Sequence, residues 1–255
     1  MTRLAAASAV GALLWTSPVL AERLILSLSS PSVAIGSDYS GGQVVAFGIV
    51  ERDGQTVSRR GEYDVVITLR GPREAPIIRR KEEFGPIWLN RSQQKFVSVP
   101  AALGVYASRP LRAIADEPTR LRLRLGISAI VAAPDFTLER GGYDEPFRAA
   151  LVRLKARDGL YEEKQDAVTF ITPEVFRASL SVPAIAPPGR YEVEATLLAE
   201  GILIARQQAG FELVKTGFEE KITTMARERR LLYGLATAAT ALFFGWLASV
   251  IFRRD

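Results

Sequence analysis

Ser92 and Lys95 stand at the S-x-x-K spacing of serine acyl enzymes, in which the serine hydroxyl is the nucleophile. The motif falls between two predicted strands, and the S-D-N motif that accompanies it in those enzymes is absent from the sequence. Acidic neighbours occur at Asp116/Glu117, Glu162/Glu163 and Glu219/Glu220. Side chains adjacent in sequence diverge on a helix or a strand, so these pairs do not converge on one substrate atom. We therefore interpret all of these residues as solvated surface groups.

The chain has 255 residues and contains no cysteine and no histidine. This excludes disulfides, thiolate nucleophiles, zinc–cysteine sites, Ser-His-Asp catalysis and histidine-ligated metals. The sequence also has no phosphate-binding glycine loop and no calcium-loop spacing. We expect a protein that is not an enzyme and that holds no cofactor and no metal.

The formal net charge is +5, and much of the excess lies beside an apolar C-terminal segment, where anionic lipid accounts for it. No basic run is interleaved with aromatic residues, which argues against a nucleic-acid partner. Four arginines in the first half of the chain could bind a small anion together with backbone amides: Arg70, Arg73, Arg79 and Arg80.

Both ends of the chain carry apolar segments. Residues 1–21 have a basic residue, a short apolar stretch and a small residue before a cut after Ala21, which is typical of a secretory signal peptide. The alternative is a first transmembrane helix, but Ser17 and Pro18 interrupt the apolar run. Near the other end, Leu231–Phe252 has 22 residues and no charge, long enough at ~1.5 Å per residue to cross a bilayer core of ~30 Å.

The C-terminal segment therefore predicts a transmembrane helix over 231–252, preceded by a juxtamembrane helix over 217–230 and followed by a tail, 253–255. Small residues repeat along one face of the predicted helix and would let a second helix approach closely. They are Gly234, Ala238, Ala241, Gly245 and Ala248.

Residues 22–216 predict a mainly β body. Residues 43–50 are nearly all apolar and indicate a strand buried on both faces, whereas 63–70 alternate and indicate a half-buried strand. A turn at 187–189, an alternating strand from Tyr191, a tight turn at Glu200-Gly201 and a last strand are typical of the end of an immunoglobulin-like β-sandwich. Residues 101–158 have helical composition and predict a helical insertion, with helix entries at Asp116 and Asp144.

Trp88 follows Gly85-Pro86 in the most distinctive stretch of the body. It could be an exposed anchor for a partner, or an aromatic residue packed under a turn, and we favour the packed position.

The signal peptide and the basic residues give opposite predictions of orientation. More basic residues precede the apolar segment than follow it, which would keep the body in the cytoplasm. Because exported domains cross largely regardless of charge, we favour a bacterial inner-membrane protein with its body in the periplasm and its C-terminus in the cytoplasm.

Several blocks in this order resemble an alphaproteobacterial family of transmembrane proteins without an assigned activity: VVAFGIVERDG, YDVVITLRGP, IIRRKEEFGPIWLN, FRASLSVP with GRYEVEATLLAEG, and LLYGLATAATALFFGWLASVIF. The resemblance covers nearly the whole chain after residue 21. It implies architecture and a membrane location, and it points to a transport partner such as a permease. We expect an accessory or interaction module for a membrane partner; the alternative is a periplasmic module that binds or senses a small anion.

Overall fold

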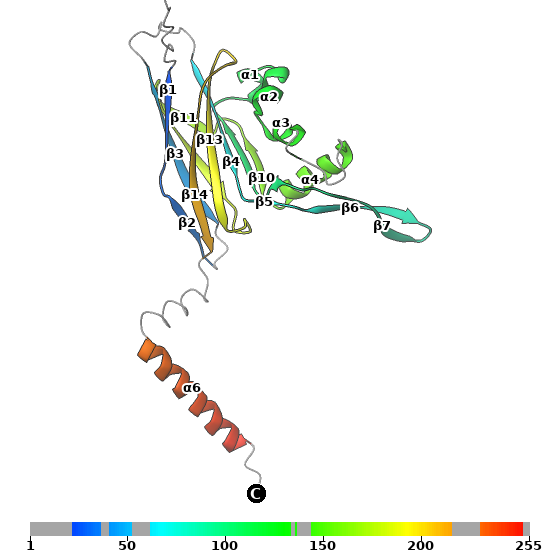
Figure 1. Cartoon of the computed structure of the whole chain (residues 1–255), viewed down its shortest axis with the longest axis vertical. Helices are drawn as coiled ribbons and strands as arrows, with labels where there is room; N and C mark the ends of the chain where they lie inside the picture. The colour runs from blue at the N-terminus through cyan, green and yellow to red at the C-terminus, as the bar shows by residue number, and fades with distance from the viewer. Residues whose placement is uncertain are drawn as a thin grey trace, which may run out of the picture.

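The computed structural model describes residues 22–36, 41–52, 62–133, 136, 144–215 and 230–251, and it is mainly β (Figure 1). Three predicted segments lie outside these residues: the signal peptide at 1–21, the juxtamembrane segment before Arg230, and the tail at 253–255.

Two sheets make up the body. The four-stranded sheet has the order β1 (Arg23–Leu28), β3 (Gly42–Glu51), β12 (Val175–Val182) and β11 (Val168–Thr172). The six-stranded sheet has the order β10 (Tyr161–Lys164), β9 (Leu103–Ala107), β4 (Tyr63–Arg70), β13 (Gly189–Ala199), β14 (Ile202–Lys215) and β2 (Ser32–Ile35). Pairings are antiparallel, except that β10 runs parallel to β9 and β2 runs parallel to β14.

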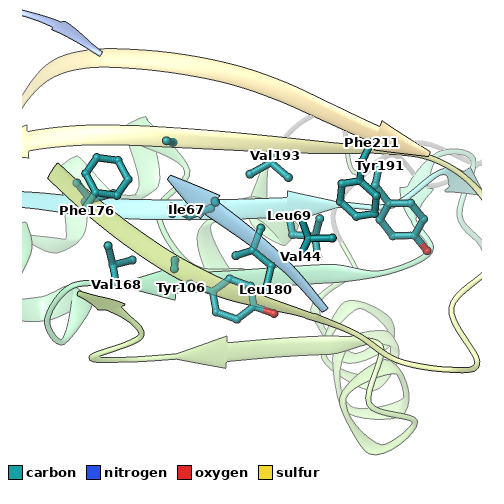
Figure 2. Close-up of a cluster of buried hydrophobic side chains, with 14 of the residues drawn as sticks. Val44, Ile67, Leu69, Tyr106, Val168, Phe176, Leu180, Tyr191, Val193 and Phe211 are labelled. Atoms are coloured by element: carbon teal, nitrogen blue, oxygen red, sulfur yellow. The ribbon is translucent and has the colours of Figure 1, made fainter. Parts of the chain in front are cut away.

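The two sheets face each other across one apolar core. Val44 and Leu180 project from the four-stranded sheet toward Ile67 and Val193 of the six-stranded sheet, and all four are fully buried (Figure 2). Burying a side chain of this size stabilises the fold by roughly 1.5–3 kcal/mol. This packing explains why the alternating apolar positions of the strands are the most buried residues of the chain.

The burial of β3 and β4 is the reverse of the prediction. In β3, Phe47 and Ile49 are 41% and 46% exposed, so this strand is half-buried rather than buried on both faces. In β4, every residue from Tyr63 to Leu69 is buried, although the sequence alternates. The reason is a layer of helices that covers the outer face of the six-stranded sheet and not that of the other sheet (Figure 1).

The helical layer consists of α1 (Leu111–Ile114), α2 (Glu117–Leu123), α3 (Ile127–Ala132) and α4 (Glu145–Arg157). It begins later than predicted, because residues 103–107 form β9 rather than helix. Asp116 caps α2 by accepting a hydrogen bond from the Thr119 amide at 3.1 Å. Asp144 precedes α4 without such a bond. The layer encloses a second core, in which Phe147 and Leu151 of α4 pack toward Val66 and Val105 of the sheet.

A long hairpin leaves the body beside α4. It consists of β6 (Ile77–Phe84) and β7 (Ile87–Lys95), with a turn at Gly85-Pro86, and it projects well beyond the sheets (Figure 1). At its base, Ile78 and Phe96 are buried in the second core. The short strands β5 (Arg73–Glu74) and β8 (Val99–Pro100) pair beside this base.

The last β-hairpin of the body follows the sequence closely. β13 and β14 join at Glu200 and Gly201, whose φ values of 50° and 76° are those of a tight turn. The Tyr191 hydroxyl donates to the carbonyl of Pro187 at 2.9 Å, the arrangement called a tyrosine corner in immunoglobulin-like domains. The Tyr191 ring stacks on Phe211 with centroids 5.3 Å apart.

A helix of 22 residues, α6 (Arg230–Ile251), lies near the C-terminal end of the chain. Most of its described side chains are exposed, including Leu235, Leu242, Phe243, Phe244 and Trp246. Taken over the described residues alone, no helix combines the length and the apolar character required to cross a membrane.

Candidate anion-binding pocket

A basic pocket of about 410 Å³ lies where the outer face of the six-stranded sheet meets the helical layer. Its charged lining consists of Arg70, Arg73, Arg124, Arg190 and Glu192. Ile130 and Phe136, both buried, supply an apolar wall. Four guanidinium groups against one carboxylate make this a place where an anion is favoured electrostatically.

Strand periodicity places the sheet arginines. Leu69 and Tyr191 point into the core between the sheets, so their neighbours Arg70 and Arg190 emerge on the opposite, outer face. Glu192 lies directly across from Arg70 in the pairing of β13 with β4. Arg73 follows in β5, after Gly71 and Pro72, which also line the pocket.

Arg124 reaches the pocket from the end of α2. Its φ of 59° and ψ of 43° are left-handed, a conformation that glycine or asparagine usually supplies at a helix end. A residue other than glycine in this conformation carries a backbone strain of about 1 kcal/mol or more. An arginine therefore occupies a position where local backbone preference favours glycine, at the wall of the basic pocket.

Arg70 and Arg73 of the pocket each contact another side chain of the protein. Arg70 pairs with Glu194 at 3.6 Å, and Arg73 donates to the Ser98 hydroxyl at 3.0 Å. Glu194 is shared, since Gln208 donates to it at 2.9 Å. Guanidinium groups carry five N–H donors each, so these contacts leave donors available to a ligand.

The structure brings together only half of the predicted anion set. Arg70 and Arg73 line the pocket, whereas Arg79 and Arg80 lie on the projecting hairpin. Arg80 pairs with Glu82 at 2.8 Å and lies 6.0 Å from the Phe147 ring centre. The other two arginines of the pocket, Arg124 and Arg190, were missed because they come from α2 and β13, far from Arg70 in sequence. For Arg190, the signal in the sequence was its place beside the core residue Tyr191 in an alternating strand.

Ser92 and Lys95 do not form a catalytic pair. Ser92 lies in β7 and donates to Glu82 at 2.5 Å, and Arg80 holds the same carboxylate. These bonds lower the pKa of Glu82, first through Ser92 and then through Arg80. Three residues apart on a strand, Ser92 and Lys95 point to opposite faces. Serine acyl enzymes with an S-x-x-K motif also carry a K-T-G motif. This sequence has a K-T-G triplet at 215–217, but the triplet starts at the end of β14, in a sheet from which the hairpin projects away (Figure 1).

Trp88 lies near the tip of the hairpin and is 65% exposed. The interpretation as a packed core residue was therefore wrong. Phe84, Ile87 and Leu89 beside it are also exposed, so the tip carries a cluster of apolar side chains.

The predicted small-residue face lies on α6. All five of its members are exposed, and the space around Gly234 and Gly245 is open for at least 4 Å from an added Cβ. No described residue packs on this face at those two glycines, which leaves room for a second helix.

A second cavity, of about 500 Å³, opens at one end of the core between the two sheets. The Tyr106 hydroxyl lies in it, 3.4 Å from Glu162, and accepts a hydrogen bond from the Ser181 amide at 3.0 Å. Burial raises the pKa of Tyr106 to about 12, and burial likewise raises that of Tyr191, at the same cavity, to about 12. These phenols are neutral at physiological pH and act as hydrogen-bonding groups only. Among the described residues, no cluster of acidic side chains is arranged to hold a metal ion.

The fold and the site define a mainly β protein with a basic pocket on one sheet and an apolar helix near its C-terminal end. Over residues 23–254 the chain matches the family described as "Putative transmembrane protein (Alph_Pro_TM)", and it belongs to that family. This family has no assigned function, and it places the chain at a membrane. No curated protein matches the chain.

Proposed function

We propose that this protein is a non-enzymatic accessory or interaction module for a membrane partner such as a permease, held at the bilayer by its C-terminal segment. The observation that carries the proposal is the exposure of Leu242, Phe243 and Trp246 on α6, since such side chains are stable when lipid or another helix covers them. The 22 uncharged residues of Leu231–Phe252 are long enough to cross the bilayer.

In this proposal the body is an immunoglobulin-like sandwich in the periplasm of a bacterium, with a helical insertion, and the C-terminus is in the cytoplasm. The tyrosine corner at Tyr191 and the face-to-face sheets support the sandwich. The signal-like residues 1–21 support export.

Two fusions placed just before Phe218 test the orientation. Alkaline phosphatase is active only after export, whereas a fluorescent protein that does not fold after export reports the cytoplasm. We expect active phosphatase and a dark fluorophore. The opposite pair of results would make this a tail-anchored cytoplasmic protein.

Pairing through the small-residue face is tested by Gly245→Leu, which would fill the open space on α6. We expect loss of the membrane partner on purification, because the helices could no longer approach closely. Ala239→Leu, on another side of the helix, is the matched control and should retain the partner. Unchanged co-purification of the Gly245→Leu protein would contradict pairing through this face.

A second candidate function, binding or sensing of a small anion, is favoured by the pocket of four arginines. Clustered like charges destabilise one another, and a bound anion relieves that repulsion while accepting charge-assisted hydrogen bonds. The apolar wall of Ile130 and Phe136 suits a carboxylate with an apolar portion, besides sulfite, sulfate or phosphate.

A thermal-shift comparison tests this function. We expect the melting temperature to rise with one of these anions, and the rise to disappear in Arg73→Gln and Arg190→Gln. Arg79→Gln is the matched control, because that arginine is exposed on the hairpin and should leave the shift unchanged. A flat response to sulfite, sulfate, phosphate and carboxylates would contradict the proposal.

A further inference from the structure

The hairpin of β6 and β7 is exposed over most of its length. Nearly all of its side chains beyond Ile78 are exposed or half-buried, on both faces. A two-stranded hairpin is marginally stable on its own in water, and its outer part adds nothing to either core. Strands of 8 and 9 residues at ~3.4 Å per residue make an arm of about 27 Å. Such an arm is suited to contact a surface beyond the body.

The tip of the arm is apolar on both faces. Phe84 pairs across the turn with Ile87, while Trp88 projects on the other face opposite Glu83. The exposed fractions of Phe84, Ile87 and Trp88 are 60%, 51% and 65%. Exposed aromatic and aliphatic side chains gathered at a protruding turn have the composition of segments that enter the interface of a bilayer.

The strands behind the tip are basic. From Arg79 to Lys95 the hairpin has five basic and two acidic side chains, a net charge of +3. One of the acidic groups, Glu82, is held by Arg80 and Ser92. The Arg91 guanidinium lies 5.9 Å from the Phe84 ring centre, so its positive charge is directly behind the apolar tip. If the tip enters a bilayer, positive charge directly behind it lies at the level of the phosphate groups of anionic lipids, which it complements.

We propose that the tip of this hairpin, formed by Phe84, Ile87, Trp88 and Leu89, inserts into the interface of an anionic phospholipid bilayer, with Lys81 and Arg91 on the headgroups. The chain belongs to a transmembrane family, so a bilayer is the surface within reach of the body. The hairpin is then a second membrane contact besides α6. It would fix how the body is oriented on the membrane.

Tryptophan fluorescence of the full chain in lipid vesicles tests the proposal. The sequence has three tryptophans, Trp15, Trp88 and Trp246. A chain with Trp15→Phe and Trp246→Phe reports only the hairpin, and one with Trp15→Phe and Trp88→Phe reports only α6. Both are reconstituted in vesicles of brominated phosphatidylcholine, with and without brominated phosphatidylglycerol. Bromine on the acyl chains quenches a tryptophan that has entered the bilayer.

We expect about a twofold loss of Trp88 fluorescence in the anionic vesicles and little loss in the neutral ones. Lys81→Gln with Arg91→Gln should abolish the loss, whereas Arg177→Gln, exposed on the four-stranded sheet, should not. If Trp246 is quenched in its variant while Trp88 is not quenched in the other, the proposal is overturned, and α6 is still a membrane anchor. Equal quenching in both lipids overturns the role of charge. If the fluorescence emission of Trp88 changes in native membranes but not in lipid vesicles, the hairpin contacts a protein and the proposal is overturned.

Discussion

Asp64 and Arg109 form a bidentate ion pair at the start of the helical layer. The Arg109 Nε donates to Oδ1 of Asp64 at 2.7 Å, and its Nη2 donates to Oδ2 at 2.5 Å. The Asp64 side chain is only 2% exposed, and the Ser108 hydroxyl donates to the same carboxylate at 3.1 Å. The pair raises the pKa of Arg109, first through its hydrogen bonds and then through the charge of Asp64. It joins the outer face of β4 to the segment that leads into α1.

Replacing Arg109 by methionine should lower the free energy of unfolding by about 1–3 kcal/mol, because a buried carboxylate loses its partner. Arg109 is half exposed, so water takes over part of its role and keeps the loss in this range. Asp64→Asn with Arg109→Met should be more stable than Arg109→Met alone. Urea unfolding measures the change, and equal stability of Arg109→Met and the wild-type chain would contradict this account.

Gly48 and Phe176 form a cross-strand pair in which the ring covers the glycine. A Cβ added at Gly48 would lie 1.9 Å from the Phe176 ring. We expect Gly48→Ala to destabilise the body by about 1–3 kcal/mol, since the ring must move within a packed core. Adding Phe176→Leu should recover part of the loss by making room, whereas a double variant less stable than both singles would contradict this packing. Thermal or urea unfolding provides the measurement.

Buried tyrosines predict a loss of stability at alkaline pH. Burial raises the pKa of Tyr106 and of Tyr191 to about 12, above the ordinary value of 10, and burial also raises that of Tyr161. Between pH 10 and 12 the unfolded chain loses these protons while the folded chain keeps them, so ionisation favours unfolding. The stabilising contribution is therefore complete below pH 10 and falls as the pH rises toward 12. Urea unfolding at a series of pH values checks the slope. Tyr106→Phe should reduce this slope, because one of the three buried phenols is removed, and an unchanged slope would contradict the assignment.

The tyrosine corner predicts a specific effect of Tyr191→Phe. The phenylalanine keeps the ring stacked on Phe211 but removes the hydrogen bond to the Pro187 carbonyl. We expect a loss of about 0.5–1.5 kcal/mol in the free energy of unfolding. Tyr191→Leu also removes the stacked ring and should cost more. A Tyr191→Phe chain as stable as the wild type would show that the hydrogen bond contributes nothing net.

Local patterns predicted those parts of the fold that neighbouring residues decide. The strand from Tyr191 and the turn at Glu200-Gly201 were predicted from alternation and turn chemistry, and the start of α2 from the cap at Asp116. The basic pocket was half predicted. Arg70 and Arg73 are close in sequence, whereas Arg190 reaches the site only through the pairing of β13 with β4. Trp88 was predicted to be packed and is exposed, because the sequence of a glycine–proline turn is the same whether or not other residues cover the turn.

The sequence by itself determined the mainly β body, the uncharged segment near the C-terminal end and the absence of cysteine and histidine, because composition and short-range periodicity are properties of the chain. Only the tertiary structure decided which strand faces were covered. β4 is buried on both faces and β3 on one, in contrast to their patterns, because the helical layer packs against one sheet alone. The same long-range packing gathers four arginines into one pocket and leaves the hairpin exposed. Contacts between residues distant in sequence depend on the whole fold, and a local pattern does not contain them.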